Sequence, residues 1–339
     1  MTNLFKKAIL WTDLHFGLKS NSDSHNIDCI NYINWMTDIA KKENCETCFF
    51  LGDYHNNRAS MNIRTMNYAV KGLEIVSKQF DQTFFILGNH DLYFRDRRDI
   101  QSVEWAKHIP NIRVIDKFFK EGNVSIVPWL IEDEHKKIEK LDTRYMFGHF
   151  ELPGYYMNAS ILMPDNGEIK REHFKNIGEV FSGHFHKRQT GKGNISYIGN
   201  CFPHNYADAG DDARGCVVLE WDKPPRYIDW PEQPKYRVYN LSDVLNNPDD
   251  LLKENMHVRV NLDIDISYEE ATFIKENFAE SYKLREISLL PIKSTNSLGQ
   301  EMQTDIKFES VAQIVSDGIM TLDSEVYNKN LLLEIYNTL

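Results

Sequence analysis

Short apolar runs alternate with longer segments of helical periodicity in the first part of the chain. The runs at residues 8–11, 48–51 and 83–87 have the length and apolar content of buried strands. Residues 27–42 and 63–80, which lie between them, carry apolar side chains at helical spacing. Because strands and helices alternate, the pattern predicts a layered α/β domain.

Shorter apolar segments extend this pattern toward the middle of the chain. Further strands are expected at residues 124–127, 145–147, 180–182, 195–198 and 216–219. Pro224 and Pro225 follow, and two adjacent prolines neither extend a helix nor donate to a sheet. We therefore expect the first domain to span residues 1–225.

A smaller β-α-β pattern is expected over residues 226–292. Residues 257–264 alternate as a strand does, residues 267–278 have helical spacing, and residues 282–290 return to a strand pattern. The start of the helical segment, from Ser267 to Glu270, fits a capping box. The sequence therefore predicts a second, smaller domain built around one helix.

Residues 293–339 are expected to hold a linker and two short helices. The chain is rich in Ser, Thr, Asn and Gly up to residue 305, which is typical of a flexible linker. Apolar spacing then predicts helices at residues 310–317 and 324–339. Such a helical pair could dock on a partner protein or pack on its own domain, and the sequence leaves both possibilities open.

The composition fits a packed globular protein but gives it an acidic charge balance. Hydrophobic residues make up 42% of the 339 positions, and no apolar run approaches the roughly 20 residues that span a bilayer. The first residues lack the pattern of a signal peptide, so we expect a cytoplasmic protein without a membrane partner. The net charge of −11 argues against nucleic-acid binding unless metal ions or a partner subunit supply positive charge.

The five cysteines are scattered along the chain, as they usually are in reduced proteins. Cys45 and Cys48 form a C-x-x-C pair, but neither a redox nor a zinc-binding context surrounds them. We therefore expect a structural role for both.

Five short polar motifs each follow a predicted strand directly. They are Asp13-Leu14-His15, Gly52-Asp53, Gly88-Asn89-His90-Asp91, Gly148-His149 and Gly183-His184-Phe185-His186. In open α/β sheets, functional groups collect at the carboxyl ends of the strands, so these loops should converge on one edge. Asp, Asn and His side chains suit manganese, iron or zinc better than calcium, and thiolates are absent from the motifs. Each motif alone is weak, but the five in this order predict a dinuclear metal site.

The ordered motifs resemble those of the calcineurin-like metallophosphoesterases, from about residue 8 to residue 221. The resemblance implies two stacked β-sheets flanked by helices, with two divalent metal ions at one edge. It implies one ion held by Asp13, His15 and His186, a second held by Asn89, His149 and His184, and Asp53 bridging both. Two such ions activate a water molecule for attack on phosphorus.

Two further residues of the third motif are expected to take part in catalysis. His90 has no ligand role in this scheme and stands where the family places a general acid, which protonates the leaving oxygen. Asp91 is expected to orient His90.

Several landmarks are more specific than the superfamily pattern. The third motif ends in Asp91 where protein Ser/Thr phosphatases have Glu, which points away from that class. The segments V-P-W at 127–129, G-H-F-E-L at 148–152 and Y-I-G at 197–199 resemble the double-strand-break nucleases that include the SbcD and meiotic-recombination-eleven proteins. The closest resemblance is to the recombination endonuclease subunits of T-even-type phages.

This resemblance implies a manganese-dependent exonuclease and endonuclease that acts on DNA. It also implies a homodimer paired with a coiled-coil ATPase of the structural-maintenance type, working in recombination, repair or replication. The small domain would cap the active site and the C-terminal helices would grip the ATPase. A phage-encoded protein of this kind would act in the host cytoplasm.

Candidate substrate contacts are less sharply defined by the sequence. The loop after Asp53 is one residue shorter than in some family members, and His55 or Asn56 could take the phosphate-handling role that the resemblance implies there. Arg58 is either a DNA-phosphate contact or an ordinary surface arginine, and the aromatic and basic run 93–98 has the same two interpretations. His204 lies in a loop after a strand and could line the DNA path.

Two other functions compete with a DNA nuclease. A phosphatase or nucleotide phosphodiesterase of the same superfamily would share the metal site, because the fold alone does not choose the substrate. It would not need a capping unit or C-terminal helices. A non-catalytic scaffold would be expected to have lost a ligand or His90, and the sequence retains all of them.

Overall fold

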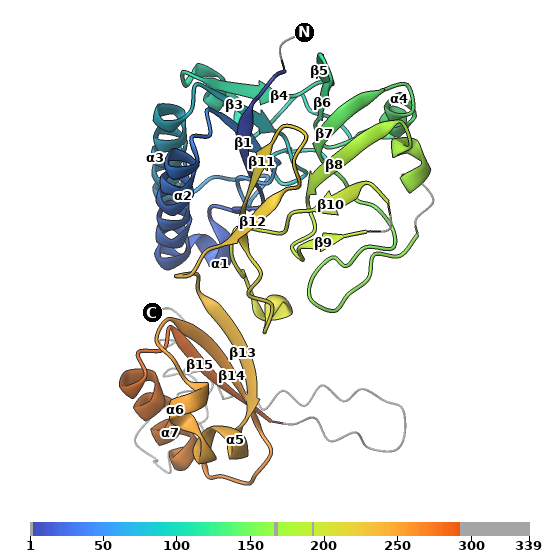
Figure 1. The fold of residues 1–339 in the computed structure, drawn as a ribbon. Helices are drawn as coiled ribbons and strands as arrows, with labels where there is room; N and C mark the ends of the chain where they lie inside the picture. The colour runs from blue at the N-terminus through green and yellow to red at the C-terminus, as the bar shows by residue number, and fades with distance from the viewer. Residues whose placement is uncertain (1–2, 166–168, 192, 292–339) are drawn as a thin grey trace, which may run out of the picture.

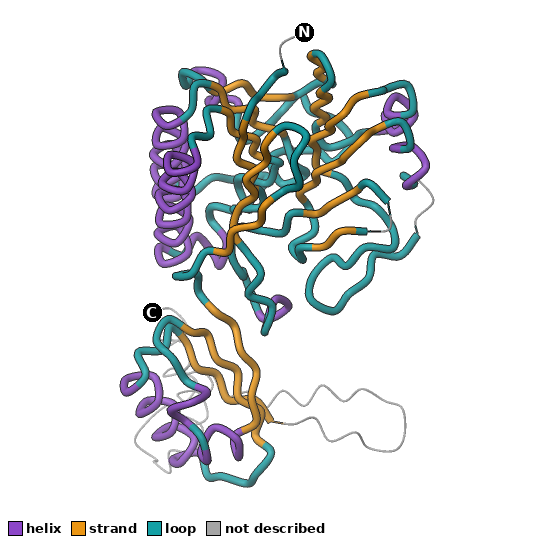
Figure 2. The backbone as a smooth tube through the Cα atoms, in the orientation of Figure 1, coloured by secondary structure: helices purple, strands orange, loops and turns teal. Residues whose placement is uncertain are grey.

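The computed structural model describes residues 3–165, 169–191 and 193–291. Two six-stranded sheets stack face to face, and a separate three-stranded sheet lies beyond them. Figure 1 and Figure 2 show long helices covering the outer face of the first sheet, with mostly loops and short helices beside the second. The predicted α/β fold with two layered sheets and flanking helices is confirmed.

The first sheet has the strand order β12-β11-β1-β2-β3-β4. β1 to β4 run parallel, and β11 and β12 add antiparallel strands at the other side of β1. The strand bounds are β1 Lys7–Trp11, β2 Thr47–Phe50, β3 Gln82–Ile86, β4 Ile112–Ile115, β11 Gly215–Glu220 and β12 Arg226–Asp229. The expected strands within β1, β2, β3 and β11 are found, whereas β4 and β12 were not expected.

The second sheet has the order β5-β6-β7-β8-β10-β9. Its central strands β6, β7, β8 and β10 are parallel, and the two edge strands are antiparallel to their neighbours. The bounds are β5 Phe119–Glu121, β6 Val124–Val127, β7 Thr143–His149, β8 Ile177–Gly183, β9 Gln189–Thr190 and β10 Ile195–Tyr197. The short edge strands β5 and β9 carry little apolar pattern, which is why the sequence did not predict them.

Alternation along the strands divides the interior into layers. In β1, Ile9 and Trp11 pack toward the helices, whereas Ala8 and Leu10 pack between the two sheets. β2 divides in the same way, because successive strand side chains point to opposite faces. Parallel strands buried on both faces read as continuous apolar runs, which is what made these strands visible in the sequence.

Two long helices cover the outer face of the first sheet. α2 spans Asp23–Glu43 and α3 spans Ile63–Gln79, and the side chain of Asn62 accepts hydrogen bonds from two amides of the first turn of α3. The expected helix at residues 27–42 thus begins four residues earlier. The shorter helices are α1 Leu18–Asn21, η1 Glu104–His108, η2 Glu132–Glu134, α4 His135–Ile138, η3 Arg171–Phe174 and η4 Tyr206–Asp208.

The third sheet is parallel, in the order β13-β14-β15. Its elements are β13 Lys235–Asn240, α5 Leu241–Asn246, α6 Pro248–Leu251, β14 Met256–Leu262, α7 Tyr268–Ser281 and β15 Glu286–Pro291. The capping box at Ser267 is present, with its hydroxyl accepting from the Glu270 amide. The apolar pattern predicted β14 and β15 but did not predict β13.

β12 lies beyond the division expected between residues 225 and 226 and is part of the first sheet. β12 follows the two prolines and is hydrogen bonded to β11 across the register Gly215 to Asp229. Trp230, just after β12, is buried in the core beneath α2. The first sheet therefore extends to Asp229. Residues 230–234, which include Pro231 and Pro234, lead to β13. The linker and the two helices expected over residues 293–339 lie outside the described residues.

Arg285 of the small sheet reaches back to the first unit. Its guanidinium pairs with both carboxylate oxygens of Asp28 on α2, one of them at 2.7 Å. Asp28 is buried, so this pair is shielded from water. Near it, the side chain of Tyr236 on β13 accepts a hydrogen bond from Lys19 of α1. The small unit is thus tied to the segment that follows the first polar motif.

The remaining sequence expectations concern cysteines and membranes. All five cysteines are buried and free of disulfides, and burial raises the pKa of both Cys45 and Cys48 to about 12. This fits the structural role expected for the C-x-x-C pair. Among the described residues, no helix is long and apolar enough to cross a membrane.

Candidate metal centre

The loops after β1 and β2 are hydrogen bonded to each other along their backbones. The Asp13 amide donates to the Gly52 carbonyl at 2.9 Å. The Leu14 and His15 amides both donate to the Asp53 carbonyl, at 3.1 and 3.2 Å. Because β1 and β2 are parallel neighbours, their carboxyl ends meet at one edge of the sheet. This pairing brings the first two polar motifs together.

Four residues of the motifs have left-handed backbone angles although none of them is glycine. The φ angles are 53° at Asp13, 55° at His15, 62° at Asp53 and 87° at His184. Each such residue costs roughly 1–3 kcal/mol unless the surrounding structure holds it. Strain of this kind clusters at functional sites, and here it coincides with the expected ligands.

One group of donors gathers around the side-chain oxygen of Asn89. His149 Nε2 lies 3.1 Å and His184 Nδ1 lies 3.0 Å from Asn89 Oδ1. His149 Nε2 is also 3.4 Å from Asp53 Oδ2. Asp53, His149 and His184 offer ligand atoms that all lie within 4.8 Å of one another, so the group could hold a metal ion.

The other nitrogens of these two rings have partners that fix the ring orientation. His149 Nδ1 lies 2.7 Å from the Leu51 carbonyl oxygen, and His184 Nε2 lies 3.4 Å from Glu151 Oε1. Carbonyl and carboxylate oxygens accept hydrogen bonds, so these nitrogens carry hydrogens. The nitrogens that face Asn89 Oδ1 are the ones a metal ion would take, displacing any hydrogen they carry toward that oxygen. An oxygen acceptor on the other ring nitrogen is typical of metal-bound histidines.

A second group of donors lies on the other side of Asp53. His15 Nε2 is 3.8 Å from both Asp13 Oδ1 and Asp53 Oδ2, and the rings of His15 and His186 are 5.6 Å apart between centroids. Asp13 Oδ1 and both ring nitrogens of His15 are buried without a hydrogen-bond partner among the described residues. Such atoms are rare in folded proteins, so this donor set fits a bound cation.

The carboxylate of Asp53 stands between the two groups. Burial alone would raise its pKa, but His149, His90 and His15 hold it well below the ordinary value. Burial lowers the pKa of His149, but the charge of Asp53 outweighs it and raises the pKa to about 9. A cation held by His149 would have to displace this proton, because metal ligands are deprotonated.

His90 lies at the rim of the site with a fixed ring. Its amide donates to Asp53 Oδ1 at 2.8 Å, and its Nδ1 lies 2.8 Å from the Asn56 carbonyl oxygen. The ring of His15 is 4.9 Å away, edge to face. Since the carbonyl accepts from Nδ1, Nε2 is the nitrogen left to exchange a proton with a substrate.

Asp91 does not orient His90, contrary to expectation, since the His90 ring is held by Asn56. The buried Asp91 carboxylate instead accepts hydrogen bonds from four backbone amides, those of Asp53, Tyr54, His55 and Gly88. Burial and the neighbouring Asp53 raise its pKa to about 7. Asp91 therefore holds the turn that carries Asp53 in place through backbone hydrogen bonds, and it has no hydrogen bond to the His90 ring among the described residues.

The structure separates the three substrate-contact candidates. His55 is fully buried, with Nδ1 3.0 Å from Ser102 Oγ, which argues against the phosphate contact expected for it. Arg58 lines a cleft together with His90, as a substrate contact would. His204 is also buried, but its ring lies 5.3 Å from His15 and 5.2 Å from His186. Its burial beside two of the expected ligands fits an open DNA path poorly.

Three residues that support the site were not found from the sequence. Glu151 faces His184, Asp208 Oδ2 lies 4.0 Å from His186 Nδ1, and His25 Nε2 lies 2.9 Å from the His15 carbonyl oxygen. Glu151 lies two residues after His149, which is a weak signal. Asp208 and His25 reach the site only through the tertiary fold.

Replacing Gly52 by alanine is expected to disrupt the site. A Cβ at Gly52 would lie 2.5 Å from His149 Nδ1 and 2.8 Å from the backbone of Gly88, and its φ of +106° disfavours any other residue. We expect the variant to bind divalent metal at least about tenfold more weakly, as measured by calorimetric titration.

The matched control for this prediction is Gly122→Ala. Gly122 also has a positive φ, of +54°, but a Cβ there would meet nothing within 4 Å. This variant carries backbone strain without a clash and should keep wild-type metal affinity. Equal metal affinity in both alanine variants would show that the close approach at Gly52 does not matter.

Comparison with known proteins agrees with this geometry. The model of the calcineurin-like phosphoesterase family matches residues 8–188, and the chain belongs to that family. A curated relative is exonuclease subunit 1 of Enterobacteria phage T4, which is 27% identical over 208 residues. The match covers 59% of this chain and 60% of the phage protein, so it spans less than two thirds of that relative.

Three solved structures also share similarity with the chain. They are a Pseudomonas putida nuclease (16% identity, 56% of this chain and 66% of that chain, TM-score 0.30), an E. coli phosphoesterase (12%, 67% and 94%, 0.35) and a Danio rerio dimetal phosphatase (12%, 63% and 92%, 0.35). At these TM-scores the three structures add nothing to the assignment, which rests on the family match.

Proposed function

We propose that this chain is a DNA nuclease that hydrolyses phosphodiester bonds with two divalent metal ions. The observation that carries the proposal is Asp53, whose carboxylate stands between two groups of buried nitrogen and oxygen donors. One ion would be held by Asp13, His15 and His186, the other by Asn89, His149 and His184, with Asp53 shared. The carboxylate and amide oxygens of this donor set suit manganese, which we propose as the metal.

Two bound cations would activate a water molecule and neutralise charge on the phosphoryl oxygens. The protein supplies the positioning and the proton. His90 Nδ1 is fixed by the Asn56 carbonyl, so Nε2 would protonate the leaving oxygen. Asp91 would hold the turn of Asp53 in place through its four amide hydrogen bonds.

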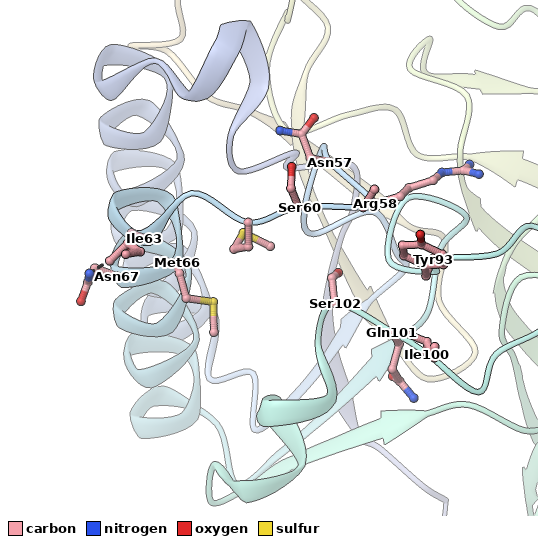
Figure 3. Close-up of a pocket in the computed structure, with 12 residues that line it drawn as sticks. Asn57, Arg58, Ser60, Ile63, Met66, Asn67, Tyr93, Ile100, Gln101 and Ser102 are labelled. Carbon is pink, nitrogen blue, oxygen red and sulfur yellow. Dashed lines mark hydrogen bonds between the residues drawn. The ribbon is translucent and has the colours of Figure 1, made fainter.

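Open clefts beside His90 support a polymeric substrate over a compact one. Arg58 lines a cleft with His90, and also a larger one of about 510 Å³ next to it. Figure 3 shows the larger cleft, with Tyr93 and Gln101 from the loop after β3 facing residues of α3 and of the loop after β2. A strand that extends beyond the scissile phosphate would have room there.

Two arginines near the site are suited to phosphate contacts. In the described part of the chain, no carboxylate forms an ion pair with Arg58 or Arg95. Burial lowers the pKa of the Arg58 guanidinium, and the positive charge of Arg95 lowers it further. The two arginines are therefore near enough to repel each other. By contrast, Arg98 is bound to Glu134 and to the Trp129 carbonyl, and Arg97 pairs with Asp99. Unpaired arginines in an acidic protein favour an anionic ligand at this rim.

The name of the phage relative adds the context of an assembly. Because that protein is an exonuclease subunit, we propose that this chain also works with a partner subunit. The motif resemblance to the double-strand-break nucleases leads us to propose a coiled-coil ATPase of the structural-maintenance type as this partner, a homodimer, and a role in recombination, repair or replication. Sedimentation of the full chain, alone and with the ATPase subunit, tests both points, and a lone monomer in both samples would refute them.

A phosphatase or nucleotide phosphodiesterase is the second candidate. The net charge of −11 favours it, because DNA binding is weakened by negative charge. The proposed ions and the unpaired arginines would offset this charge only locally.

Degradation of linear double-stranded DNA with Mn²⁺ tests the proposal, beside hydrolysis of para-nitrophenyl phosphate by the same preparation. We expect DNA to be degraded, the monoester to be cut poorly, and both activities to stop when the metal is chelated. Efficient cleavage of the monoester with intact DNA, even when the ATPase is present, would favour the phosphatase instead.

A further inference from the structure

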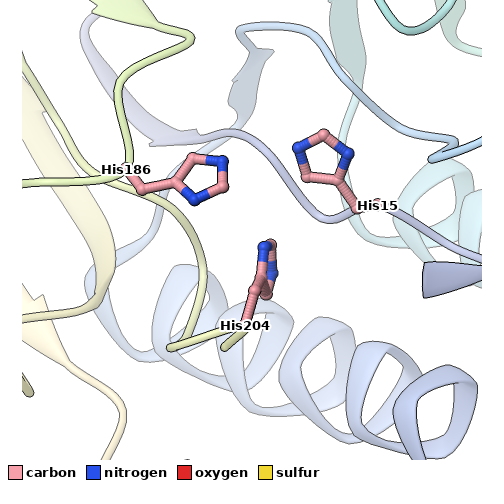
Figure 4. A group of neighbouring side chains, drawn as sticks. All are labelled: His15, His186 and His204. Carbon is pink, nitrogen blue, oxygen red and sulfur yellow. The ribbon is translucent and has the colours of Figure 1, made fainter. Parts of the chain in front are cut away.

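A third histidine ring, His204, lies beside His15 and His186. Its side chain is 1% exposed, and ring centroids place it 5.3 Å from His15, 5.2 Å from His186 and 5.4 Å from His25. Figure 4 shows the rings of His15, His186 and His204 arranged around one common space. Their ligand atoms all lie within 4.8 Å of one another.

The polar atoms of His204 are only partly satisfied by the protein. Its backbone amide donates to Asp208 Oδ2 at 3.0 Å. Both of its ring nitrogens are buried and have no hydrogen-bond partner among residues 3–165, 169–191 and 193–291. A buried donor or acceptor left without a partner costs about 1–3 kcal/mol, so a purely structural histidine would be poorly placed here.

The loop that carries His204 is anchored to the rest of the site. Cys201 Sγ donates to the Thr12 carbonyl at 3.0 Å, directly before Asp13. Asn205 accepts from the Ala207 amide at the start of η4, and the buried Asp208 holds the His204 amide while it faces His186. A loop anchored on both sides of His204 in this way holds its backbone in place beside His15 and His186, which preorganises the residue for a ligand.

We propose that His204 is a third imidazole ligand of the metal ion held by Asp13 and His15, alongside His186. Burial excludes His204 from an open substrate path, and the common space between the three rings gives an ion one nitrogen from each. Imidazole suits zinc and iron, whereas magnesium prefers oxygen ligands. His204 would therefore bias this ion position toward zinc or ferrous iron and away from magnesium.

This inference rests on the two-metal centre proposed above but not on the identity of the substrate. Zinc titration of the metal-free protein by calorimetry, without any phosphoester, therefore tests it directly. We expect two zinc ions per wild-type chain, and His204→Gln should weaken one of the two sites by at least about tenfold. The matched control, His257→Gln, removes a buried histidine of the small sheet and should leave both affinities unchanged.

Each outcome of the titration decides one point. If wild type binds no zinc, the two-metal centre itself fails. If wild type and His204→Gln bind two ions equally well, while their metal-free forms melt at the same temperature, His204 is not a ligand.

A structure of the zinc-loaded wild type covers the case in which the variant does not fold. We expect a His204 nitrogen about 2.0–2.1 Å from the ion near His15. A zinc ion bound by His15 and His186, with His204 beyond ligand distance, would overturn the inference.

Discussion

Replacing His90 by glutamine is expected to slow phosphodiester hydrolysis by about 10²- to 10⁴-fold, the usual contribution of a general acid. Its Nδ1 atom is engaged by the Asn56 carbonyl oxygen at 2.8 Å, which leaves Nε2 to supply the proton. Glutamine can still hydrogen bond but cannot supply a proton at neutral pH. Single-turnover cleavage of a DNA oligomer at saturating Mn²⁺ measures the effect.

The same variant should bind metal nearly as well as wild type. The ligand atoms of His90, His15 and Asp53 all lie within 4.8 Å of one another, so the three residues could hold one metal ion. Loss of metal would therefore be the competing explanation for a slow variant. Calorimetric titration separates the two cases. A tenfold loss of metal affinity in His90→Gln would mean that His90 is a ligand, and an unchanged rate would remove it from the mechanism. His108→Gln, at the last residue of η1, is the control for a histidine-to-glutamine change outside the site and should keep the wild-type rate and metal affinity.

Replacing Asp91 by alanine is expected to destabilise the protein by at least about 3 kcal/mol. Four buried backbone amides would lose their acceptor at once, including that of Asp53. Because the Asp53 turn would lose its support, both metal affinities should fall as well. Urea denaturation in the presence of a chelator measures the stability effect without a contribution from metal.

Asp91→Asn should have an intermediate effect, because it keeps one acceptor oxygen and turns a donor toward the remaining amides. Asp96→Ala, an exposed carboxylate in the next loop, is the matched surface control and should change stability by less than about 0.5 kcal/mol. If Asp91→Ala were as stable as Asp96→Ala, the four amides would have other partners and the bracing role would be wrong.

The core strands were predictable because burial on both faces leaves an unmistakable apolar run. β1, β2, β3 and β6 were located within about one residue. β12 was missed because Arg226 to Asp229 carries charge at both ends and follows two prolines. Only its pairing with β11 shows that it belongs to the first sheet, although it lies past the expected boundary at residue 225.

The supporting residues of the site could not be predicted in the same way. Glu151, Asp208 and His25 reach their histidine partners only in the folded protein. The closeness of Glu151 to His149 in the chain is a weak signal, and nothing in the neighbouring sequence marks Asp208 or His25.

Asp91 was expected to orient His90, but its carboxylate accepts from four backbone amides, while the His90 ring faces the Asn56 carbonyl oxygen. These partners depend on how the loops after β2 and β3 pack, which the order of the two residues in the chain does not show.

The sequence by itself determined the strand pattern, the five polar motifs and their family, because each motif is local and follows a recognisable apolar run. The tertiary structure alone decided which side chains meet. In the folded protein, His55 is buried with its ring against Ser102, and Arg58 lines a cleft with His90. His204 lies beside His15 and His186. The physical reason is that a histidine's partners depend on the packing of distant loops, which leaves no periodic trace in the chain.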